Sequence, residues 1–132
     1  MDNNIIYNIK GLDKLVNLQW LDLSFNLIEK IEGLEKLTKL TDLSLYSNNI
    51  SQITGLETLV NLNVLSLGSN KFTDFVEPIR YLYNLRLQNL QVLKMSENPF
   101  SKTKDHEYKL YAIAFLSKLK YLDYELIDDE AR

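Results

Sequence analysis

Hydrophobic positions recur along the chain with a step of 22 residues. The sets that keep this step are Leu12, Leu34 and Leu56; Leu18, Leu40 and Leu62; Leu21, Leu43 and Leu65; Leu23, Leu45 and Leu67; Gly11, Gly33 and Gly55; and Asn4, Asn26, Asn48 and Asn70. The unit reads L-x-x-L-x-L-x-x-N-x-I-x-x-I-x-G-L-x-x-L. Self-similarity at such a period indicates a stack of structural repeats that share one core.

The two halves of the unit predict different elements. The L-x-L segment has a period of two, which is typical of a short strand with both leucines on one face. The I-x-x-I-x-G-L-x-x-L half has helix-like spacing and predicts a 3₁₀ or short α-helical return on the outer side. The asparagine follows the strand, where its amide could satisfy backbone groups of neighbouring turns. Successive strands are then expected to stack in parallel.

The last unit is longer than the others. Asn98 lies 28 residues after Asn70, so about six residues are inserted on the return side. Because proline favours the first turn of a helix, Pro78 predicts a longer convex helix over roughly residues 76–84. The last strand is expected at Leu90-x-x-Leu93-x-Met95.

The repeat pattern changes after Phe100. Asp105 is a candidate N-cap for a helix near residues 106–116, with His106 as a surface or capping residue. Leu116, Leu119, Leu122 and Ile127 read as a degenerate closing unit. We therefore expect one domain over residues 1–132, with repeats in 1–100 and a helical cap in 101–132. Asn4 lacks a preceding L-x-L strand, so we expect the chain to be a fragment of a longer protein.

These motifs resemble the leucine-rich repeat pattern. The 22-residue step with I-x-x-I-x-G-L is similar to the intracellular subclass found in phosphatase-1 regulatory subunits and the axonemal dynein leucine-rich light chain. The strings WLDLSFNLIEKIEGLEKL, VLSLGSNKF and YLDYELIDDEAR are most similar to the leucine-rich domain of the dynein regulatory complex subunit 3 family, a nexin-link component of motile cilia. The resemblance implies an α/β fold: a right-handed solenoid with a concave parallel sheet, a 3₁₀/α convex side and a C-terminal helical cap.

Composition narrows the classes of function. The net charge is −3, with 15 basic and 18 acidic residues, which disfavours binding to nucleic acid. The absence of cysteine excludes disulfides and thiolate metal sites and favours a cytosolic-type compartment. The polar N-terminus is unlike a signal peptide, and no apolar run reaches the length of a membrane span. We expect no catalytic residues, cofactor, metal or small-molecule substrate.

The variable residues of each strand segment should point outward on the concave face. The candidates for partner binding are Trp20, Asp22, Phe25, Asp42, Tyr46, Val64, Val92 and Lys94. Exposed aromatic side chains on a rigid sheet are typical interface anchors. The alternative is that Trp20 and Phe25 only cover the sheet, or that they pack against repeats of the longer protein that are missing from this sequence. Asp22 and Asp42 could form an acid–base or metal pair, although a solvated surface is the simpler interpretation.

Two hypotheses for function remain open. The first is a non-catalytic protein-interaction scaffold in the axonemal dynein regulatory complex, located in the cytoplasm and in the axoneme of cilia or flagella. The second is a leucine-rich regulatory subunit that docks a protein phosphatase or a dynein heavy chain. Both predict a protein partner on the concave face, so co-purification is the observation that separates them.

Overall fold

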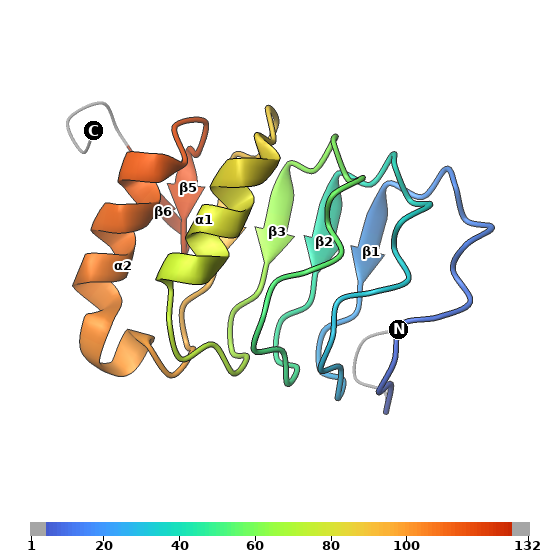
Figure 1. Ribbon diagram of the computed structural model, residues 1–132, viewed down its shortest axis with the longest axis horizontal. Coiled ribbons are helices and arrows are strands. Elements are labelled where there is room, and N and C mark those ends of the chain that lie inside the picture. Colours follow the sequence, from blue (N-terminus) through green and yellow to red (C-terminus); the bar gives the residue numbers. More distant parts are fainter. Residues whose placement is uncertain (1–4, 128–132) are drawn as a thin grey trace.

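The structure is a computed structural model that describes residues 5–127 (Figure 1). Asn4, the first asparagine of the predicted series, lies outside these residues. Within them, six short strands form a single sheet in chain order. The strands are β1 (Trp20–Asp22), β2 (Asp42–Ser44), β3 (Val64–Ser66), β4 (Val92–Lys94), β5 (Tyr121–Leu122) and β6 (Glu125–Leu126). Strands β1 to β5 run parallel, and only β6 pairs antiparallel with its neighbour. The predicted α/β solenoid with a parallel sheet is confirmed.

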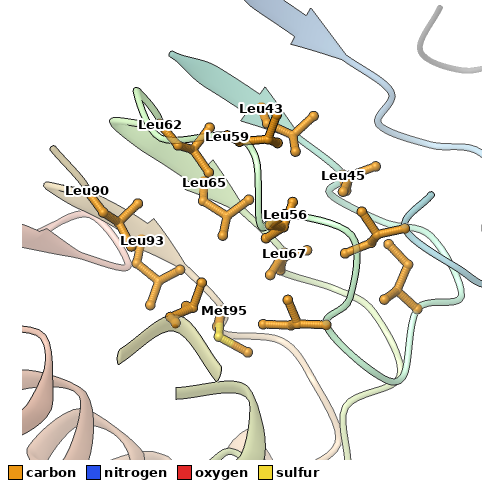
Figure 2. Packing of buried hydrophobic residues seen from close by; sticks show 14 of the residues in the cluster. Leu43, Leu45, Leu56, Leu59, Leu62, Leu65, Leu67, Leu90, Leu93 and Met95 are labelled. Carbon is orange, nitrogen blue, oxygen red and sulfur yellow. The ribbon is translucent and has the colours of Figure 1, made fainter. Parts of the chain in front are cut away.

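The 22-residue step sets the register of the sheet. The second leucine of the unit pairs with its equivalent across four successive strands, and a fifth leucine continues the row: Leu21, Leu43, Leu65, Leu93 and Leu122. These side chains point inward, where leucines from the return segments meet them (Figure 2). Burial of one leucine contributes about 1.5–3 kcal/mol, so the stacked rows supply most of the driving force for folding.

Short turns form the return halves in the first repeats. In the second repeat the N–H of Leu37 donates to the carbonyl of Leu34 at 3.0 Å, and the N–H of Leu40 donates to the carbonyl of Leu37 at 3.1 Å. These bonds span three residues, which is the 3₁₀ pattern expected on the convex side. The same pair of bonds recurs one step earlier and one step later in the chain.

The buried asparagines tie neighbouring repeats together. The Asn48 amide nitrogen donates to the carbonyls of Leu23 and Leu45 at 3.0 and 3.1 Å, and its oxygen accepts from the N–H of Ile28 at 3.0 Å. Asn70 and Asn98 repeat this arrangement one unit further along. Each amide therefore satisfies backbone groups of two repeats inside the core, as predicted.

The inserted residues form helix α1 (Val76–Leu85), close to the predicted range of 76–84. Ile79 and Leu82 are buried against the core, while Arg86 ends the helix in the left-handed conformation with φ 52°. The N–H of Arg86 donates to the carbonyl of Tyr83 at 3.1 Å. The longer unit thus replaces the short convex turn by a helix.

Helix α2 (Ser101–Phe115) covers the C-terminal end of the core and lies beside α1 (Figure 1). The predicted start with Asp105 as N-cap is wrong, because the turn at Asn98 already leads into helix at Ser101. Lys104 is non-helical, so α2 consists of two helical pieces, and the second piece starts within a residue of the helix predicted near residues 106–116. Asp105 instead forms an ion pair with Lys109 at 3.3 Å, and His106 is exposed without a capping role. No helix within residues 5–127 is both long and apolar enough to span a membrane.

Candidate functional site

The concave face presents the variable residues of each strand, as the pattern predicts. Trp20, Asp42, Val64 and Val92 occupy one row across the sheet, and Asp22, Ser44, Ser66 and Lys94 occupy the next. Phe25 and Tyr46 lie in the turns that follow β1 and β2. All eight predicted residues therefore lie on or directly after the strands. The sheet thus aligns residues from four repeats, from Trp20 in β1 to Lys94 in β4.

An open hollow of about 520 Å³ lies on this face. Its lining is Trp20, Ser24, Phe25, Asp42, Leu43, Ser44, Tyr46, Val64, Ser66, Lys94 and Tyr124. Six of the eight predicted residues contribute to it, while Asp22 and Val92 lie outside the lining. Its aromatic members remain accessible: Trp20 is 65% exposed and Phe25 is 51% exposed.

Aromatic contacts hold one wall of the hollow. The rings of Phe25 and Tyr46 meet edge to face, with centroids 5.6 Å apart. The Tyr46 hydroxyl donates to Oε2 of Glu97 at 2.9 Å. This bond joins the turn after β2 to the turn after β4 and so fixes the phenol. This hydrogen bond is the main cause that raises the pKa of Tyr46 above its ordinary value, and burial adds to it. The phenol therefore stays a hydrogen-bond donor through the physiological pH range.

The opposite wall contains Tyr124, which sequence analysis missed. Lys94 Nζ lies 4.3 Å from the centroid of the Tyr124 ring, within the range of a cation–π contact. Tyr124 sits in the turn between β5 and β6 with φ 73°. This positive φ folds the chain back and brings the ring beside Lys94. The repeat pattern ends before this turn, so periodicity gave no signal for Tyr124.

The carboxylates of the face make local hydrogen bonds. Asp22 Oδ1 accepts from the N–H of Ser24 at 2.9 Å and also from its hydroxyl, which contacts the hydroxyl of Ser44 at 2.8 Å. Asp42 lies opposite Trp20, so the two aspartates are diagonal neighbours, as predicted. Within the described part of the chain, no cluster of three or more His, Cys, Asp or Glu side chains could hold a metal ion. The arrangement therefore offers carboxylates and hydroxyls to a ligand.

Solved structures share the fold over most of the chain. A structure of the Drosophila melanogaster SNF/U2A′ complex matches with a TM-score of 0.84 and 27% identity, covering 96% of this chain and 71% of that chain. Internalin C2 from Listeria monocytogenes matches with a TM-score of 0.65 and 29% identity, covering 88% of this chain and 46% of that chain. Both similarities agree with a parallel-stranded solenoid.

Curated relatives match a shorter stretch at higher identity. Dynein regulatory complex subunit 3 from Homo sapiens is 49% identical over 51 residues, which is 39% of this chain and 9% of the human protein. The Macaca fascicularis protein of the same name is 48% identical over 51 residues. The similarity thus spans less than a tenth of these relatives, while it includes about two-fifths of this chain.

The repeats themselves match a known sequence family. The profile described as "Leucine Rich repeats (2 copies)" matches residues 16–58 and again residues 38–81, so the two matches together span half of the chain. The matched region contains β1, β2 and β3 with their leucine rows and three of the buried asparagines that link repeats, Asn26, Asn48 and Asn70. The chain belongs to the leucine-rich repeat family.

Proposed function

We propose that this domain is a non-catalytic scaffold whose concave face docks a protein partner. Leucine-rich repeat proteins use extended concave surfaces for binding. The observation that supports this role here is the hollow with four aromatic side chains on its rim and floor: Trp20, Phe25, Tyr46 and Tyr124. Tryptophan and tyrosine are enriched among the residues that dominate binding energy at interfaces.

The rigidity of the face favours tight docking. Trp20 projects from β1, and Phe25 and Tyr46 project from the turns after β1 and β2, where parallel pairing and buried asparagine amides fix the backbone. A preorganised surface loses little conformational entropy on binding, so more of the contact energy appears as affinity.

The charges around the hollow indicate a basic partner segment. Asp42 lines the hollow, and Asp22 and Glu97 lie beside it, whereas Lys94 is the one cation of the lining and lies over Tyr124. Complementary charge steers association and penalises wrong partners. We therefore expect a partner segment that combines apolar side chains with arginine or lysine.

The relatives suggest where the scaffold operates. Because a 51-residue stretch is 49% identical to dynein regulatory complex subunit 3, we propose that the domain is an assembly module of that complex in the axoneme of cilia or flagella. The alternative is a regulatory subunit that docks a protein phosphatase or a dynein heavy chain. Other subunits of the complex are the expected partners in the first case.

Affinity purification separates these functions. The domain, immobilised on resin, should capture axonemal doublet proteins from a ciliary extract. The W20A/F25N variant should lose this capture, because it removes two exposed anchors without disturbing the core. The control V60A/L110A removes two exposed apolar side chains away from the hollow and should capture normally. Capture of a soluble phosphatase instead would favour the alternative, and equal capture by W20A/F25N would contradict docking on the concave face.

A further inference from the structure

A second pocket lies where helices α1 and α2 end. It has a volume of about 240 Å³ and shares no lining residue with the concave hollow. Its lining is Leu82, Tyr83, Arg86, Leu87, Gln88, Leu90, Phe115, Leu116, Ser117 and Lys118. Leu82, Leu90 and Leu116 are buried and form an apolar floor. Tyr83 and Phe115 remain partly exposed and form an aromatic wall, with ring centroids 5.6 Å apart.

The insertion in the last long repeat creates this pocket. Tyr83 belongs to α1 and Phe115 to α2, and Figure 1 shows the two helices side by side with their C-terminal ends at the same edge. The shorter repeats have turns in place of α1, so they offer no equivalent wall. Arg86 follows α1 and Lys118 follows α2, which places both cations at the pocket.

The charge of this pocket differs from that of the concave hollow, whose lining holds one carboxylate, Asp42, and one cation, Lys94. The lining of the pocket contains two cations and no carboxylate. Among residues 5–127, neither Arg86 nor Lys118 forms an ion pair: the bridges found there join Lys30 to Glu32 and Lys109 to Asp105 and Glu125. An apolar floor beside two cations that pair with no carboxylate of residues 5–127 is complementary to a ligand that joins an apolar group to carboxylates.

We propose that this pocket docks an acidic peptide segment of a protein partner by accepting one apolar side chain, with carboxylates of the segment beside Arg86 and Lys118. The volume supports a single side chain, because pockets for whole small molecules usually measure about 300–1,000 Å³. The domain would then hold two partners of opposite charge, one in the concave hollow and one between the helix ends.

Two short peptides test the proposal with the intact domain. Acetyl-Glu-Phe-Glu-amide is the probe, and acetyl-Lys-Phe-Lys-amide has the same apolar group with reversed charge. In ¹H–¹⁵N NMR titrations the acidic peptide should shift the amides of Tyr83, Leu87 and Leu116 and bind about tenfold more tightly than the basic one, and added salt should reduce the difference.

Charge variants assign the effect to the two cations. Because each exposed charge pair contributes modestly, R86Q/K118Q should weaken binding of the acidic peptide about fivefold. The control K14Q/K36Q removes two exposed cations outside the pocket and should leave binding within about twofold. Equal binding of both peptides, shifts centred outside the pocket, or equal losses in the two variants would overturn the proposal. None of these outcomes depends on the concave face.

Discussion

The two ends of the solenoid differ, although one repeat runs between them. At the C-terminal end Tyr108 of α2 is fully buried, and its ring lies 4.9 Å from the ring of Phe100. At the N-terminal end Ile5 is 75% exposed, and Leu15 and Val16 are exposed as well. A solenoid is stabilised by repeats and by the interfaces between them, so an end that buries less should be less stable.

Polar chemistry completes the C-terminal end. Asp123 Oδ1 accepts from the N–H groups of Met95 and Ser96 at 2.7 and 2.9 Å, and Oδ2 accepts from the Tyr108 hydroxyl at 2.8 Å. Burial, reinforced by the Asp123 charge, raises the pKa of Tyr108 and keeps it a donor. One carboxylate thus accepts from the backbone N–H of Met95, whose equivalent Leu67 in the preceding repeat donates instead to a carbonyl of the next strand, that of Lys94. The C-terminal cap therefore forms where the sequence no longer follows the 22-residue period.

The largest expected difference in stability is between a substitution in the middle of the core and the equivalent substitution at its N-terminal edge. Leu43→Ala should destabilise the domain by about 2–5 kcal/mol, because Leu43 is buried between two strands. Leu21→Ala should cost less, since Leu21 is 7% exposed against 1% for Leu43 and β1 pairs with a single strand among the described residues. Denaturant unfolding measures both. Equal losses would show that the N-terminal edge is packed as well as the middle.

Two glycines at the same position of the repeat test the same comparison between the N-terminal end and the middle of the domain. Gly11 and Gly55 both have positive φ, which costs alanine about 1–2 kcal/mol. A Cβ on Gly55 would lie 2.4 Å from the carbonyl oxygen of Ile31, whereas one on Gly11 would meet nothing within 4 Å. Gly55→Ala should therefore exceed about 2 kcal/mol in total, and Gly11→Ala should remain within the conformational cost. Thermal unfolding of the pair checks this, and a larger loss for Gly11→Ala would contradict it.

Removal of the Tyr108 hydroxyl, which donates to the Asp123 carboxylate in the C-terminal cap, should have a smaller effect on stability. Tyr108→Phe should cost about 1.5 kcal/mol, the lower end for a bond to a charged group, because Asp123 keeps its two backbone donors. Tyr111→Phe is the control, since that ring packs on Phe75 at 5.7 Å and should change stability by no more than about 0.5 kcal/mol. If the two variants unfold at the same denaturant concentration, the hydroxyl does not stabilise the cap.

Sequence analysis predicted the elements correctly where the 22-residue period holds. It failed where the structure depends on a kink, an unusual turn or the packing of one helix on another. Leucine and asparagine spacing located β1 to β4, and Pro78 located α1. The start of α2 was missed because a kink at Lys104 joins two helical pieces, and no capping motif marks such a junction. Tyr124 was missed because Asp123 and Tyr124 adopt positive φ without being glycine, which local propensity disfavours. The pocket between α1 and α2 depends on how two helices meet, and spacing within each does not determine that.

The smallest free energy is expected for local opening of the N-terminal end. The N–H of Leu27 donates to the carbonyl of Ile6 at 2.9 Å, and the N–H of Asp123 donates to the carbonyl of Leu93, also at 2.9 Å. The two bonds match in length, so different exchange rates would report different opening of the two ends. We expect fast exchange for Leu27 and for residues 5–9, and slow exchange for Asp123, in dilute protein. If exchange at residues 5–9 slows as concentration rises, that end pairs with a second copy, for which the edge of β1 that pairs with no strand of residues 5–127 is the expected place. Equal protection of Leu27 and Asp123 would show that the N-terminal end is closed as well as the C-terminal one, despite the exposure of Ile5.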